Sequence, residues 1–101
     1  MVEVRWTDQA LSDIENIAEF ISKDSFKYAE IQVQRFFSKV DVLISHPHSG
    51  RMVPETSNKL IRELIQGNYR IIYKIISVNQ IDILTVHNSR RLLINNPTFD
   101  A

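Results

Sequence analysis

The first residues of the chain alternate between apolar and charged side chains. In the stretch VEVRW, residues 2–6, two valines and a tryptophan occupy every second position. A period of two is typical of a β-strand that buries one face. We therefore predict a strand over residues 2–6.

A helical pattern follows directly. Apolar residues recur three and four positions apart up to Ile21, with charged residues on the opposite side. This spacing predicts an amphipathic helix over residues 8–23, which Thr7 or Asp8 can cap.

A second helix is predicted after a short polar break. Asp24 or Ser25 can cap it, and its apolar spacing continues to about His46, where Pro47 stops it. Because the break is short, the two helices should form an antiparallel hairpin. A thinner stripe lies off the main apolar face. It is either a half-covered edge of the core or a surface for a partner, and it consists of Ile31, Arg35, Ser38 and Val42.

The second half of the chain has the period and the composition of strands. Residues 46–58, with two prolines and a glycine, are predicted to be a loop. Three strands follow, at residues 60–65, 69–77 and 81–87, and short turns join them into an antiparallel meander. The predicted order is β-α-α-β-β-β, an α+β fold in which an N-terminal helical hairpin packs on an antiparallel sheet.

The alternation within these strands also predicts two different sheet faces. We place Arg62, Arg70 and Lys74 on a face away from the helices, with His87 and Arg90 close by at the end of the last strand. Such a surface could bind phosphates or an acidic protein segment. A solvated face with cross-strand pairs of arginine and glutamate is the other interpretation.

Composition narrows the class of protein. The 101 residues fit one domain, 1–101, and include no cysteine, so disulfides and thiolate metal sites are excluded. No apolar run is long enough to span a bilayer, and the start MVEVRWTDQ lacks the apolar core of a signal peptide, so we expect a cytoplasmic protein. Residues 1–50 hold 5 Lys or Arg against 8 Asp or Glu, whereas residues 51–101 hold 7 against 4. The basic excess therefore lies in the half that carries the predicted meander.

The sequence contains no motif that is typical of a cofactor or metal site. With only Gly50 and Gly67, the chain cannot carry a phosphate-binding glycine motif. His46 and His48 are far in sequence from His87, and no zinc motif is present. We expect neither a cofactor nor a metal.

Several stretches, in their order and spacing, resemble the RelE/ParE superfamily of toxins from bacterial type II toxin–antitoxin systems. The resemblance covers nearly the whole chain. It rests on WTDQALSDIENIAEFI (6–21), PHSGR (47–51), LIREL (60–64), YRIIYKI (69–75) and ILTVHNSRR (83–91).

The ending HNSRR is similar to the H-x-x-R ending of the ParE-like branch, which implies a toxin that inhibits DNA gyrase and is not an enzyme. The RelE-like branch implies a metal-independent, ribosome-dependent mRNA endoribonuclease. In that alternative the catalytic residues would be Glu55, Arg70, His87 and Arg90. A non-toxic binding member of the superfamily is the third interpretation.

The resemblance also implies partners. A cognate antitoxin, ParD-like or RelB-like, would form a hetero-oligomer with the chain. It would contact Ile31, Arg35 and Val42 of the predicted helical hairpin, and the exposed edge of the sheet. The target would be gyrase, or the ribosome with its mRNA in the alternative, and no membrane partner is implied. The expected target contacts are Arg51, Arg62, Arg70, His87, Arg90 and Arg91.

Overall fold

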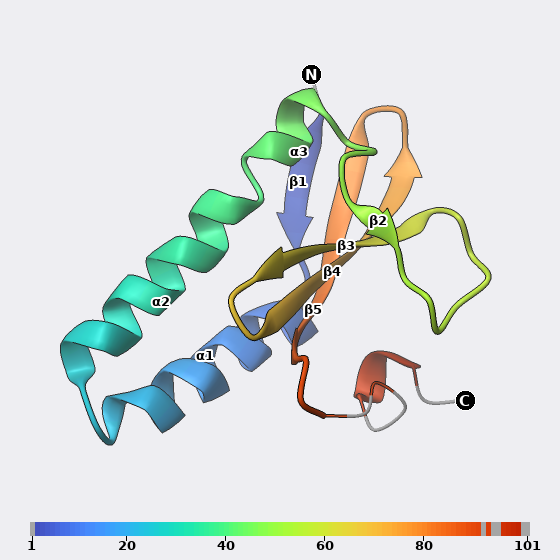
Figure 1. The fold of residues 1–101 in the computed structure, drawn as a ribbon. Coiled ribbons are helices and arrows are strands. Elements are labelled where there is room, and N and C mark those ends of the chain that lie inside the picture. Colours follow the sequence, from blue (N-terminus) through green and yellow to red (C-terminus); the bar gives the residue numbers. More distant parts are fainter. Residues whose placement is uncertain (1, 92, 94–95, 100–101) are drawn as a thin grey trace.

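The computed structural model describes residues 2–91, 93 and 96–99. Within them, two long helices and a five-stranded sheet make up most of the fold (Figure 1). The elements are β1 (Glu3–Trp6), α1 (Asp8–Ser22), α2 (Phe26–Lys39), α3 (Val42–Ser45), β2 (Arg51–Met52), β3 (Ile61–Gln66), β4 (Tyr69–Ser77), β5 (Gln80–Asn88) and the 3-10 helix η2 (Pro97–Phe99). Among these helices none combines the length and the apolar character needed to cross a membrane.

Both long helices begin at the residues that the sequence marks as caps. The hydroxyl of Thr7 accepts a hydrogen bond from the amide of Ala10 at 3.2 Å, and the hydroxyl of Ser25 accepts one from Tyr28 at 3.1 Å. Each bond satisfies an amide that has no partner inside its helix. The hairpin of α1 and α2 is therefore confirmed, and it lies on one side of the sheet (Figure 1).

The second helix is shorter than predicted. α2 ends at Lys39, and the chain tightens before α3, where Asp41 and Leu43 donate to residues three positions earlier instead of four. A tighter turn shifts the facing of the side chains that follow it. Leu43 is fully buried beyond this break, so the core is extended by a bend and not by one straight helix.

The sheet has the strand order β1-β5-β4-β3-β2 (Figure 1). β3, β4 and β5 form the predicted antiparallel meander, which confirms the α+β fold. Two details differ. β1 joins β5 in parallel, which makes the sheet mixed, and the predicted loop contains the two-residue strand β2.

The register between β3 and β4 corrects the predicted faces. The two-residue turn at Gly67, whose φ is +59°, places Gln66 opposite Tyr69. Even positions of β3 therefore pair with odd positions of β4, and Arg62 lies opposite Tyr73 on the helix side of the sheet. The prediction that Arg62 and Arg70 share a face is wrong, because the alternation within each strand does not say which parities meet.

The face away from the helices is only partly polar. A small apolar cluster covers it, built from Ile72 of β4, Val53 of the loop after β2, and Leu93. Ile61, Leu84 and Phe99 pack against this cluster. The loop and the C-terminal segment thus bury part of the face that was expected to be an open basic surface.

Candidate functional site

Arg70 lies at the centre of an ion-pair network on the face away from the helices. Its Nη1 and Nη2 donate to the two carboxylate oxygens of Glu55 at 2.7 and 2.8 Å, and its Nε donates to Glu63 at 2.6 Å. Arg51 of β2 also pairs with Glu63. Arg70 is only 9% exposed, so this network fills the position where a phosphate-binding arginine was expected.

The pairing fixes the charges. The bidentate bond from Arg70 holds the pKa of Glu55 below its ordinary value of 4.5, against the opposing effect of burial. The bonds to Glu55, with those to Glu63, raise the pKa of Arg70 above its usual range. Glu55 and Arg70 therefore stay ionised at neutral pH, and the network ties the loop after β2 to the sheet.

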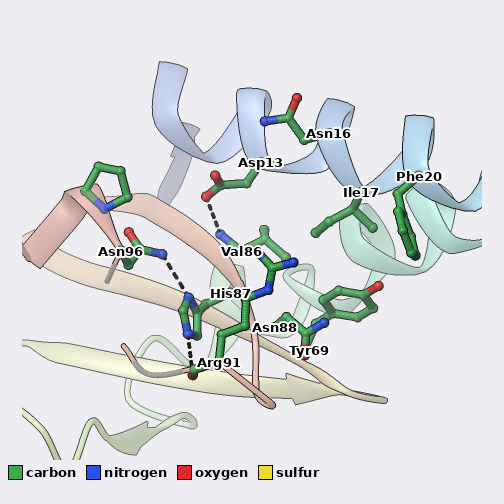
Figure 2. Close-up of a pocket in the computed structure, with 11 residues that line it drawn as sticks. Asp13, Asn16, Ile17, Phe20, Tyr69, Val86, His87, Asn88, Arg91 and Asn96 are labelled. Atoms are coloured by element: carbon green, nitrogen blue, oxygen red, sulfur yellow. Dashed lines mark hydrogen bonds between the residues drawn. The ribbon is translucent and has the colours of Figure 1, made fainter. Parts of the chain in front are cut away.

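His87 lies beside Arg70 on the neighbouring strand and is buried as well. Figure 2 shows its ring between Asn96, which contacts Nδ1 at 3.0 Å, and the carbonyl of Arg91, which contacts Nε2 at 2.9 Å. The amide of Thr98 donates to Oδ1 of Asn96, so the side-chain amide of Asn96 turns its N–H groups toward the histidine. Nδ1 then accepts and Nε2 donates, so both ring nitrogens have partners within the chain.

Asp13 continues this network into α1. One of its carboxylate oxygens accepts from the amide of Val86 at 3.1 Å (Figure 2). The same oxygen accepts from the hydroxyl of Thr85. Thr85 in turn accepts from Asn96 at 3.0 Å. Sequence analysis missed Asp13 because the helical period assigns it to the polar side of α1, and Asn96 follows no period at all.

An open cavity of about 660 Å³ lies beside this network. Its walls come from α1, the beginning of β4, the end of β5 and the C-terminal segment (Figure 2). Apolar and polar side chains alternate around it, among them Asn16, Ile17, Phe20, Tyr69 and Arg91.

The predicted target residues do not form one patch. Arg70 and His87 are adjacent, and Arg51 joins them through Glu63. Arg62 donates instead to the carbonyl of Gly50 at 3.0 Å, on the opposite face. Contact of these residues with a target stays a prediction.

Arg90 and Arg91 follow β5, and both are exposed. The chain turns here through a hydrogen bond from the amide of Arg90 to the side chain of Asn88, at 2.9 Å. These two guanidinium groups are therefore the members of the predicted target set that solvent reaches most readily, together with Arg51, whose side chain is 64% exposed.

The helical hairpin carries the predicted antitoxin residues and a groove. Ile31 is half-buried, while Arg35 and Val42 are exposed. A groove of about 420 Å³ runs between α1 and α2, and its lining includes Phe26, which is 77% exposed. The sequence did not single out Phe26, although it lies next to the predicted cap and outside the apolar spacing.

Comparison with solved structures shows the fold. The chain superimposes on a protein of the "Chromosomal ParDE TA system from P. aeruginosa" with a TM-score of 0.72 and 20% identity, covering 87% of this chain and 96% of the other. A chain of the "E.coli DinJ-YafQ complex" gives a TM-score of 0.56 and 11% identity, over 92% and 99%. At these identities the likeness concerns the fold alone.

Comparison of sequences shows the family. A protein named "Putative toxin Y4kP" from Sinorhizobium fredii (strain NBRC 101917 / NGR234) is 34% identical over 90 residues, which is 87% of this chain and 88% of the relative. Residues 4–93 match the family described as ParE toxin of the type II toxin-antitoxin system parDE. The chain therefore belongs to the ParE toxin family of type II toxin–antitoxin systems.

Proposed function

We propose that this toxin inhibits DNA gyrase by binding to it, without catalysis, and that a cognate antitoxin neutralises it in the bacterial cytoplasm. Membership of the ParE toxin family supports this proposal. The main structural support is that the side chains a nuclease would need are already hydrogen-bonded within the chain. These side chains are Arg70, Glu55 and His87.

A metal-independent ribonuclease needs a cation for the phosphate and groups that accept and release protons. The donors of Arg70 are directed at two carboxylates, and both ring nitrogens of His87 have partners. Freeing Arg70 would leave Glu63, whose side chain has no exposed surface, with one partner fewer. Acid–base chemistry at this position would therefore require the ion-pair network to open first.

Exposed guanidinium groups serve a binding function without such rearrangement. We propose that Arg90, Arg91 and Arg51 contact the target directly, since all three are exposed. Arg70 and His87 position them, because His87 binds the carbonyl of Arg91 and Arg70 shares Glu63 with Arg51. Arg62 would act from the other face.

Purified toxin and two reconstituted reactions test the choice of target. We expect the chain to inhibit DNA supercoiling by purified gyrase and to leave mRNA intact on translating ribosomes. A variant with Arg90→Ala and Arg91→Ala should inhibit supercoiling less, whereas Lys27→Ala, on the exposed side of α2, should behave like the parent chain. Ribosome-dependent cleavage with unaffected gyrase would instead favour the RelE-like alternative, and growth without arrest on induced expression would favour a non-toxic binding protein.

For the antitoxin, the hairpin is the proposed binding surface. Both structural neighbours come from toxin–antitoxin systems or complexes. The groove between α1 and α2 offers apolar surface, and Ile31, Arg35 and Val42 lie outside its lining. An amphipathic antitoxin helix could bury this surface.

Co-expression tests the neutralisation. A genomic fragment carrying this gene with its neighbours should restore growth to cells that express the toxin. Phe26→Asp should weaken this rescue and leave toxicity intact. Val78→Asp is the matched control, because Val78 is also an exposed apolar residue, 88% exposed, but lies in the turn between β4 and β5. Equal rescue of both variants would contradict the assignment of the groove.

A further inference from the structure

β1 has one paired edge and one open edge. It lies at the end of the strand order β1-β5-β4-β3-β2, and β5 is the one strand of the described chain with which it pairs (Figure 1). Edge strands of this kind can pair with another chain. Charged side chains often prevent such pairing, and the charges of β1 therefore decide whether a partner fits.

The hydrogen bonds to β5 show which backbone groups of β1 face outward. The amide of Glu3 donates to the carbonyl of Asn79 at 2.8 Å, and the amide of Thr7 donates to that of Ile83 at 3.1 Å. Because backbone groups alternate along a strand, the odd positions of β1 face β5. The amides and carbonyls of Val4 and Trp6 consequently point away from the sheet.

We propose that this outer edge pairs, antiparallel, with β1 of a second copy of the chain, with the two-fold axis passing at Val4. In this arrangement Val4 exchanges two hydrogen bonds with its own copy, and Trp6 comes opposite Val2. The residues placed opposite each other are those whose backbone groups face outward. The two five-stranded sheets join into one.

Charge selects this register among the three symmetric ones that are centred on residues 3 to 5. With the axis at Glu3, two glutamates would lie opposite each other, and with the axis at Arg5, two arginines would do so. With the axis at Val4, Glu3 of each copy lies opposite Arg5 of the other. Both side chains project on the face away from the helices and are exposed. Opposite charges in directly opposed positions stabilise a strand pair, and like charges destabilise it.

Neighbouring side chains are compatible with this pairing. Arg5 already donates to Asp82 at 2.8 Å, but its side chain is 62% exposed, and a guanidinium has further N–H groups to offer a second carboxylate. On the helix side, Trp6 packs on Phe37 with ring centroids 4.7 Å apart, and Phe37 is 40% exposed. The edge therefore has apolar surface along one side and complementary charges along the other.

The dimer should be weak. A strand pair of about five residues buries less than the ~1,200–2,000 Å² of stable interfaces, so we expect a dissociation constant in the micromolar range or above. Sedimentation of the purified full chain, with no tag at its amino end, should show a monomer that dimerises as its concentration rises.

Charge reversal tests the register. Glu3→Arg should raise the dissociation constant about tenfold or more, because two like-charged pairs replace two attractive ones. Glu19→Arg makes the same charge change at an exposed site on α1 and should leave dimerisation unchanged. Combining Glu3→Arg with Arg5→Glu should restore much of the affinity of the dimer. Because Arg5→Glu places a carboxylate near Asp82, thermal unfolding of each variant should be measured to detect any loss of stability.

Hydrogen exchange supplies a second, independent test. The Val4 amide should become more protected as the concentration rises, whereas the Arg5 amide, which faces β5, should not change. A chain that stays monomeric into the millimolar range would overturn the proposal. Equal changes of the dissociation constant in Glu3→Arg and Glu19→Arg would also overturn it. The same holds if the Val4 amide becomes protected only when antitoxin is added and not when the concentration of the chain rises. None of these outcomes depends on whether gyrase is the target.

Discussion

The side chain of Glu63 has no exposed surface, and it lies between the guanidinium groups of Arg51 and Arg70. A carboxylate removed from water is strongly destabilised unless charged donors surround it. Two arginines provide those donors here, and Glu55 balances the second of them. The network is therefore a structural requirement of the sheet before it is a functional feature.

Removing Arg70 should consequently destabilise the protein. We expect Arg70→Ala to lower the free energy of unfolding by about 3–5 kcal/mol, because Glu63 stays buried with one partner fewer. Arg90→Ala, at an exposed position, should change it by less than about 0.5 kcal/mol. Urea unfolding of both variants measures the difference, and similar values would show that Arg70 is not structurally important.

Acid should weaken the same network through Glu55. Its pKa is lower in the folded protein than the ordinary value of 4.5, so its contribution to stability is present above that value. As the pH falls through the lowered pKa, the carboxylate is protonated and the contribution is lost. Thermal unfolding between neutral and acid pH should therefore show a smaller acid-induced loss of stability in Glu55→Gln than in the parent chain. Identical pH profiles would contradict this role.

At the scale of elements, β1 and α1 together provide hydrogen-bond partners for the backbone of β5. β1 ends at Trp6, opposite Ile83, and beyond this point no strand of the described residues lies beside this edge of β5. Asp13 of α1 takes over by accepting a hydrogen bond from the amide of Val86. A helical side chain thus replaces the strand that would otherwise continue the ladder.

Truncating Asp13 should open this edge. Asp13→Ala leaves the amide of Val86 and the hydroxyl of Thr85 without their acceptor, which should cost about 1–3 kcal/mol. Hydrogen exchange of the Val86 amide should become faster. Glu15→Ala, an exposed position on the same helix, is the control and should alter neither quantity. Unchanged protection of Val86 would show that water or another group satisfies the amide.

At the scale of the whole molecule, elements pack on both faces of the sheet, and they bury the face away from the helices only in part. The helical hairpin packs on one face, and the loop after β2 packs with the C-terminal segment on the other. We expect the target contacts at the rim of the sheet, where the exposed Arg90 and Arg91 follow β5. Loss of target binding without loss of stability is the expected signature of such rim residues.

This signature can be measured directly. The double variant Arg90→Ala and Arg91→Ala should unfold like the parent chain while its arrest of growth on induced expression becomes weaker. His87→Ala should reduce both stability and toxicity, because it removes the partner of the Arg91 carbonyl and of Asn96. Full toxicity of the double variant would show that the end of β5 has no part in engaging the target.

The amino-acid sequence alone determined the two long helices, the first strand and the three strands of the meander, with their order. Strand and helix periods, the caps at Thr7 and Ser25, and the glycine turn at Gly67 depend on residues within a few positions of one another. Local patterns of this kind can be read along a chain, and they predicted the hairpin and the meander. The resemblance carried by the same stretches predicted the toxin superfamily.

Only the tertiary structure decided which side chains meet. Whether Arg62 or Glu63 shares a face with Arg70 depends on the pairing register, which the turn at Gly67 sets for the whole strand pair. The role of Asp13 depends on residues 72 and 73 positions away in the sequence. The burial of His87 depends on the C-terminal segment that folds over β5. Such contacts depend on how complete elements pack against one another. A slip of one residue in the register would move every side chain of a strand to the other face of the sheet. The periodicity within a single element does not specify the register.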